Sequence, residues 1–147
     1  METGLIGAPE ELAEALKLSP IDADQFSPLS LAWMGDAVYE LLIRTKLLNH
    51  GSKQVNKLQK RSSSLVRAGA QAALLHQIEE ELTEQERAIY RRGRNAKSAT
   101  IARHATVGEY RTATGFEALV GWLYLTNQTP RLLALIRDGL EKMGELE

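Results

Sequence analysis

Residues 31–40 read Leu-Ala-Trp-Met-Gly-Asp-Ala-Val-Tyr-Glu, and this stretch decides how the rest of the chain is interpreted. Apolar side chains recur three and four positions apart at Leu31, Met34 and Val38, which predicts one buried face of an α-helix. Gly35 and Asp36 interrupt that face. A glycine inside a helix costs about 1 kcal/mol relative to alanine, so Gly35 indicates close approach of a helix, a ligand or a phosphate.

Asp36 is the second unusual residue of this stretch. A carboxylate among apolar neighbours loses hydration energy unless a positive group compensates for it. Two interpretations are open at this point. Either Gly35 marks a helix crossing with Asp36 solvated or paired with an arginine at its rim, or Asp36 is a functional acid.

The composition is that of one compact domain. A chain of 147 residues is long enough to bury a sizeable core. It contains no cysteine, which excludes disulfides and thiolate metal sites and favours a reducing compartment. We find no secretory segment and no apolar run near the roughly 20 residues that span a bilayer. We therefore expect a cytoplasmic protein without a membrane partner.

The net charge of −1 conceals a segregated charge pattern. Between Leu41 and Ile78 every Asp, Glu, Lys or Arg is basic, and residues 87–111 contain a single acid, Glu109. Most acids lie near the two ends of the chain and in residues 79–86. The sequence therefore predicts a strongly dipolar molecule.

The pattern along the chain predicts helices and no strands. We expect residues 1–26 to form an accessory segment with a short helix after Pro9, and residues 27–147 to form the main domain. Ser27 and Pro28 are typical of an N-cap and first helical position, and the central helix should end near His50. Thr129 and Pro130 open a last helix that ends near Gly144.

Two further helical segments lie between these. An apolar stripe from Val55 to Leu75 predicts helix, in which the serines at 62–64 either produce a kink or present hydroxyl groups to an anion. Thr83 and Glu86 have the spacing of a capping box, which predicts a short helix that ends at Arg92.

Residues 91–98 concentrate basic side chains around Gly93, and we expect a loop there. Such a loop is either a solvated tip or an anion site, and its amide, hydroxyl and backbone N–H groups favour phosphate. The predicted contacts are Arg91, Arg92, Arg94, Asn95, Lys97 and Ser98. A second basic strip consists of Lys57, Lys60, Arg61 and Arg67.

Residues 114–125 form a strongly apolar helical pattern that carries one acid, Glu117. Thr114 and Glu117 have capping-box spacing, so Glu117 is either a structural cap or a second functional acid. The sequence offers little support for other kinds of active site, since the three histidines lack metal-ligand spacing and no phosphate-loop or dinucleotide motif occurs. Carboxylates with a basic surface are typical of nucleases in which Mg²⁺ activates water.

Taken together, the two acidic helices resemble the ribonuclease III family. Residues 35–40 look like its signature helix, residues 116–125 resemble its second acidic helix, and the run from Leu29 to Met143 is similar in length and order to one catalytic domain. The basic segment, the residues before Gly35 and the lack of a following double-stranded-RNA-binding domain point to a short bacterial branch of the family.

The resemblance implies an all-α, ribonuclease III-type endonuclease domain that cleaves double-stranded RNA with Mg²⁺ and matures the 23S ribosomal RNA precursor. Asp36 and Glu117 match the family's catalytic and metal-binding acids. Two of the family's four metal-site acids have no match: Ala32 stands four residues before Asp36, and Thr114 stands three residues before Glu117. The number of metal ions therefore stays open.

The resemblance also implies a homodimer that pairs through the signature helix, with Trp33 and Ala37 at the contact. Duplex RNA is recognised mostly by shape and phosphate contacts. We therefore expect outside help in selecting the cleavage site, from the structure of the RNA or from a large-subunit ribosomal protein. Two rival interpretations remain: a non-catalytic double-stranded-RNA-binding relative, and a helical protein-interaction module with an acidic partner.

Overall fold

The computed structural model of the chain describes residues 9–20, 22–51, 54–97 and 106–146. Every regular element within these ranges is helical, which confirms the predicted all-α fold. The helices are α1 (Pro9–Leu16), α2 (Pro28–Asn49), α3 (Val55–Val66), α4 (Ala68–Ile78), α5 (Glu84–Asn95), α6 (Val107–Leu125) and α7 (Thr129–Lys142), with 3₁₀ turns at Ala23–Gln25 and Glu79–Glu81. None of the described helices is both long and apolar enough to cross a membrane.

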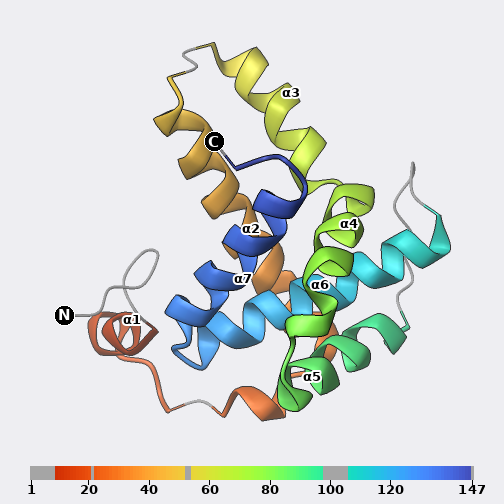
Figure 1. The fold of residues 1–147 in the computed structure, drawn as a ribbon. Coiled ribbons are helices and arrows are strands. Elements are labelled where there is room, and N and C mark those ends of the chain that lie inside the picture. Colours follow the sequence, from red (N-terminus) through yellow and green to blue (C-terminus); the bar gives the residue numbers. More distant parts are fainter. Residues whose placement is uncertain (1–8, 21, 52–53, 98–105, 147) are drawn as a thin grey trace.

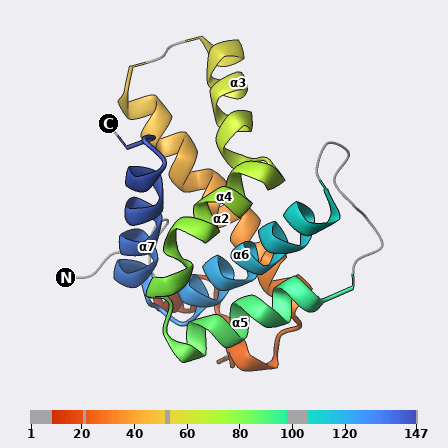
Figure 2. The same ribbon diagram turned by 45° about the vertical axis from the view of Figure 1, so that its right-hand side comes forward.

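Helix α6 is the centre of the fold. It packs against α2, α4, α5 and α7, and it runs across the middle of the molecule in both ribbon views (Figures 1 and 2). Helix α3 lies at one end of the molecule and α5 at the other, while α1 lies at the side (Figure 1). The core therefore forms around α6, and the other helices enclose it.

Local sequence signals set the limits of three helices as predicted. The Ser27 hydroxyl accepts a hydrogen bond from the Ser30 amide at 3.1 Å, and Pro28 occupies the first turn of α2. Thr83 and Glu86 form both bonds of a capping box at the start of α5. Helix α7 begins at Thr129, and Gly144 follows it with a φ of 74°.

The segment after α2 breaks at a different place from the one predicted. The serines at 62–64 lie inside α3, where Ser62 is buried and the Ser64 hydroxyl donates to the Arg61 carbonyl at 2.7 Å. The break comes at Arg67, whose extended backbone (φ −65°, ψ 161°) separates α3 from α4. Of the two alternatives for the serines, the kink is therefore wrong, and the anion contact stays untested.

Helix α6 begins earlier than the sequence pattern indicated. Its N-cap is Thr106, which forms a capping box with Glu109. Thr114 lies mid-helix instead, buried, and its hydroxyl donates to the Tyr110 carbonyl at 3.0 Å. The capping-box interpretation of Glu117 was therefore wrong, and this acid has no capping role.

Helix α5 extends further than predicted. It continues to Asn95, so residues 91–95 are helical and are not part of a loop. Gly93 serves close packing, because a Cβ atom there would lie 2.8 Å from the Ala118 Cβ and 2.9 Å from the Gly115 Cα. The basic side chains around Gly93 are thus held on a rigid element that touches α6.

Helices α2 and α6 approach each other very closely at two glycines. A Cβ atom on Gly35 would lie 1.8 Å from the carbonyl oxygen of Glu117, and one on Gly121 would lie 2.1 Å from that of Leu31. The backbones of the two helices are therefore in direct contact. This confirms the prediction that Gly35 marks a close approach.

We predict that Gly121→Ala lowers the free energy of unfolding by about 3 kcal/mol or more, because the added methyl group meets backbone that cannot move aside. Gly108→Ala, in the first turn of the same helix, is the matched control, since the nearest atom to its Cβ lies at 3.9 Å. This control variant should have a free energy of unfolding up to about 1 kcal/mol higher than the wild type. Urea denaturation measures both, and equal effects would contradict the packing argument.

Candidate functional site

The two predicted acids come from helices α2 and α6 and meet at the glycine crossing. Residues 112–124 of α6 are all buried except Glu117, which is half-buried. Asp36 is exposed on α2, directly after Gly35. The two carboxyl groups lie within hydrogen-bonding reach of each other. The structure therefore brings Asp36 and Glu117 together at the edge of the core.

The environment of Glu117 favours its protonated form. Burial, and after it the nearby charge of Asp36, together raise the pKa of the Glu117 carboxyl to about 8. A hydrogen bond from Gln71 opposes both effects. Two acids this close repel each other when both are ionised, and a divalent cation between them would remove that repulsion.

Gln71 of α4 is the site residue that sequence analysis missed. Its side-chain Nε2 donates to Glu117 Oε2 at 3.1 Å and to the Val66 carbonyl at 2.6 Å. The residue is 2% exposed, although it lies in the apolar stripe that contains Ala72 and Leu75. A polar residue at a core position of that stripe was the available signal.

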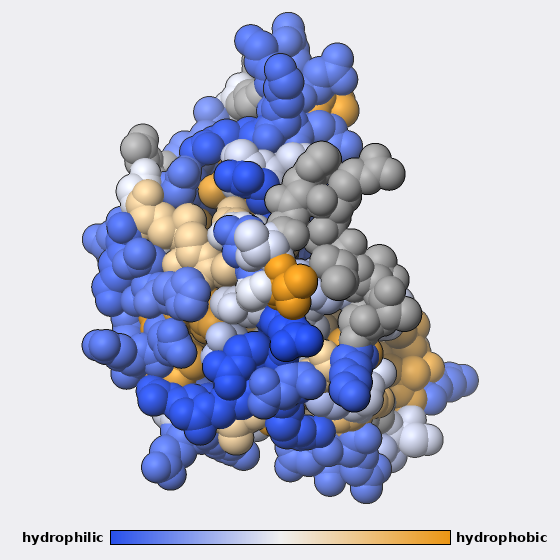
Figure 3. Space-filling view, turned by 90° about the vertical axis from the view of Figure 1, so that its right-hand side faces the viewer, coloured by the Kyte–Doolittle hydropathy of each residue, from blue (hydrophilic) through white to orange (hydrophobic). Residues whose placement is uncertain are grey.

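The described members of the first basic set, residues 91–97, lie on and just after α5, which packs against both helices of the acid pair. Helix α5 contacts both α2 and α6, and Gly93 touches Gly115 and Ala118, which flank Glu117 in sequence. Figure 3 faces the side where α5 ends and α6 begins, and strongly hydrophilic side chains gather on its lower half. The exposed members are Arg91, Arg92, Asn95 and Lys97.

Two other members of this set, Arg94 and Ser98, are not among the exposed residues that the structure describes. Arg94 is half-buried, with its guanidinium 5.5 Å from the centre of the Tyr90 ring, a cation–π distance. Ser98 lies outside the described residues.

The second basic set is spread along α3 and is not one cluster with the first. Lys57, Lys60 and Arg61 are exposed on α3, and Arg61 forms an ion pair with Glu145. Arg67 is exposed at the α3–α4 break, and its carbonyl accepts the backbone N–H of Gln71. Arg67 is thus linked to the acid pair through Gln71, which contacts Glu117.

The donor set fits a magnesium ion with few protein ligands. Among the described residues, no group of three or more His, Cys, Asp or Glu side chains is arranged to hold a metal. Mg²⁺, however, usually takes one or two carboxylates and keeps several waters. Asp36 and Glu117 supply such a pair. The Gln71 amide, whose nitrogen contacts Glu117, leaves its own oxygen Oε1 buried and without a partner within the described part of the chain.

Comparisons with known proteins identify the family. A family model described as "Ribonuclease III domain" matches residues 29–128, which is more than half of the chain. The chain belongs to the ribonuclease III family.

Its similar relatives include two named Mini-ribonuclease 3. The one from Enterococcus faecalis is 47% identical over 126 residues, covering 84% of this chain and 96% of the relative. The one from Desulfitobacterium hafniense is 49% identical over 126 residues, covering 86% of this chain and 80% of the relative. A crystal structure of a Fusobacterium nucleatum protein aligns with a TM-score of 0.76 at 34% identity, covering 86% of this chain and all of that one.

These comparisons confirm the expected family, its short branch and its helical fold. This ribonuclease III family member is an endoribonuclease. This finding argues against both rival interpretations, the protein-interaction module and the non-catalytic relative.

We predict that Glu117 makes stability fall with rising pH. An acid whose pKa is raised on folding keeps a proton that the unfolded chain has released. Its contribution is therefore complete below the ordinary value of 4.5 and is lost as the pH rises through about 8. Glu117→Gln should gain stability over the wild type between about pH 5 and about pH 8.

Urea denaturation across this pH range measures the difference. Glu109→Gln is the control on the same helix, because glutamine also serves in a capping box, and its stability at neutral pH should stay close to that of the wild type. A parallel profile for Glu117→Gln would contradict the raised pKa.

Proposed function

We propose that this enzyme is a Mg²⁺-dependent endoribonuclease that cleaves double-stranded RNA and matures the 23S ribosomal RNA precursor in the cytoplasm. The observation that carries the proposal is the pairing of Asp36 with Glu117 at the α2–α6 crossing. Membership of the ribonuclease III family supports the substrate class. The ribosomal RNA precursor rests on the resemblance to the short branch.

Asp36 and Glu117 would hold Mg²⁺, which activates water and offsets charge on the scissile phosphate when bound. Glu117 must release its proton to serve as a ligand. Ala32 and Thr114, at the positions of the two missing family acids, are both buried, and the Thr114 hydroxyl is already engaged with Tyr110. Water and RNA phosphate would therefore complete the coordination shell.

The basic side chains around Gly93 would hold the RNA backbone. Arg91, Arg92 and Lys97 are exposed on and just after α5, which packs against the helix that carries Glu117, and this supports a role for them in holding phosphates. Contacts of this kind position a duplex without reading its sequence. We therefore also propose that a large-subunit ribosomal protein or the RNA structure selects the site.

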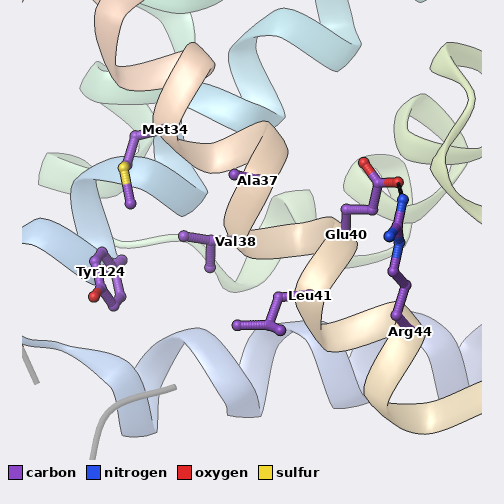
Figure 4. A pocket seen from close by; sticks show the side chains of 7 residues that line it. All are labelled: Met34, Ala37, Val38, Glu40, Leu41, Arg44 and Tyr124. Carbon is purple, nitrogen blue, oxygen red and sulfur yellow. Dashed lines mark hydrogen bonds and ion pairs between the residues drawn. The ribbon is translucent and has the colours of Figure 1, made fainter. Parts of the chain in front are cut away.

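A homodimer through α2 would place two acid pairs on the two strands of a duplex. Trp33 is 80% exposed on α2, and Ala37, one turn later, is exposed as well. A mostly apolar hollow of about 390 Å³ lies along the same helix, lined by Met34, Ala37, Val38, Glu40, Leu41, Arg44 and Tyr124 (Figure 4).

An isologous twofold contact through this helix would let each Trp33 enter the hollow of the other chain. Aromatic residues are enriched at the centres of such interfaces. The exposed indole beside an apolar hollow is the observation that supports this arrangement.

Substitution of the acids tests the catalytic proposal. Asp36→Asn and Glu117→Gln should each reduce Mg²⁺-dependent cleavage of duplex RNA by about 100-fold or more, because the metal supplies several kcal/mol of transition-state stabilisation. Both variants should fold. Glu109→Gln should cleave normally. Normal cleavage by Glu117→Gln would disprove its role as a ligand.

Neutralisation of the first basic set tests the RNA surface. Replacing Arg91, Arg92, Arg94 and Lys97 by glutamine should weaken RNA binding and flatten its dependence on salt, by about 0.9 in the logarithmic slope per lost contact on a B-form duplex. Melting temperature should change little, since three of these residues are exposed and the Arg94–Tyr90 contact is worth about 0.5–1 kcal/mol.

Binding measured at several salt concentrations gives the slope for this variant. Arg137→Gln, an exposed arginine of α7, should leave the slope unchanged. A large loss of melting temperature with unchanged affinity would assign the set to stability instead.

Light scattering tests the dimer. The wild type should have about twice the chain mass of 16.3 kDa, and Trp33→Glu should be monomeric and lose double-strand cleavage. Leu133→Glu, at an exposed apolar position of α7, is the matched control and should remain dimeric. A monomeric wild type that cleaves duplex RNA would refute the proposed interface.

A further inference from the structure

Gln71 lies where three helices meet, at the start of α4, the end of α3 and the middle of α6. Its Nε2 donates both to the carbonyl of Val66, the last residue of α3, and to the carboxylate of Glu117. Carbonyl groups at a helix end have no partner within the helix. The break at Arg67 therefore supplies one of the two acceptors that hold this side chain.

These two contacts fix the orientation of the amide. Both neighbours of Nε2 accept hydrogen bonds, so the nitrogen must face them, and the oxygen must face away. Gln71 Oε1 is buried and has no partner within the described residues. An unsatisfied buried acceptor costs about 1–3 kcal/mol, a cost that an apolar side chain of similar length at this position would not carry.

Packing alone does not explain a residue with that cost, whereas its contact with Glu117 does. We propose that Gln71 is a positioning residue that holds the Glu117 carboxylate for metal binding. Its N–H group occupies one carboxylate oxygen, restricts rotation of the group and leaves the other oxygen for the cation shared with Asp36. This inference rests on the proposed metal-dependent function.

The expected size of the effect follows from the behaviour of residues that orient metal ligands. Their loss typically lowers metal affinity by about 10- to 100-fold. A purely structural role for Gln71, as a clasp between α3 and α4, would change stability without changing the metal affinity of the folded protein. Metal affinity therefore separates the two roles.

The test is calorimetric titration of the folded protein with Mn²⁺ in the absence of RNA. Gln71→Met keeps the length and burial of the side chain but cannot donate, and we expect Mn²⁺ binding about 10- to 100-fold weaker than in the wild type. Gln77→Met is the matched control, since Gln77 is exposed on the same helix, and its affinity should equal that of the wild type. Added to Glu117→Gln, the Gln71→Met substitution should cause no further loss, because Gln71 acts through Glu117.

Each other outcome is decisive. Unchanged Mn²⁺ affinity in folded Gln71→Met would overturn the inference and leave the proposed function intact, whereas a wild type that binds no Mn²⁺ would contradict the proposed function itself. If Gln71→Met does not fold, Gln71→Asn, which is too short to reach both acceptors, replaces it with the same expectation. Loss of folding in both variants would assign Gln71 to stability and overturn the proposal.

Discussion

Backbone contact between α2 and α6 at Gly35 and Gly121 is the constraint on which the rest of the structure depends. No side chain fits between the helices there, since an added Cβ would lie 1.8 Å and 2.1 Å from carbonyl oxygens. Asp36 follows one of these glycines, and Glu117 supplies the carbonyl that the other helix touches. The separation of the two acids is therefore set by main-chain packing, which makes it rigid.

This rigidity has an energetic cost that the surroundings only partly offset. Glu117 is the one residue of the 112–124 run that is not buried, and it faces another acid instead of a base. Gln71 contributes a hydrogen bond to the charged form but leaves its own oxygen without a partner in the described structure. Features that oppose stability in a well-packed core are expected at functional sites, where activity compensates for them.

The sequence predicted what depends on neighbouring residues and missed what depends on distant ones. The start of α2 at Ser27 and Pro28 was correct, because caps are local chemistry. The start of α6 was wrong, since Thr106 and Thr114 both precede a glutamate by three residues and only tertiary packing selects the first. Gly93 was assigned to a loop because the residues of α6 that it packs against are distant in sequence. Gln71 was missed for the same reason, since Glu117 lies 46 residues away along the chain.

A site with two protein carboxylates makes metal and RNA binding depend on each other under the proposed function. At neutral pH the pKa of about 8 keeps Glu117 largely protonated, so binding of Mg²⁺ must displace that proton. RNA phosphate would add the oxygen ligands that the positions of Ala32 and Thr114 do not provide. Because such coupling is reciprocal, the cation would strengthen binding of the phosphate by the same factor. The free enzyme would then bind the cation through its two acids, and RNA would tighten that binding.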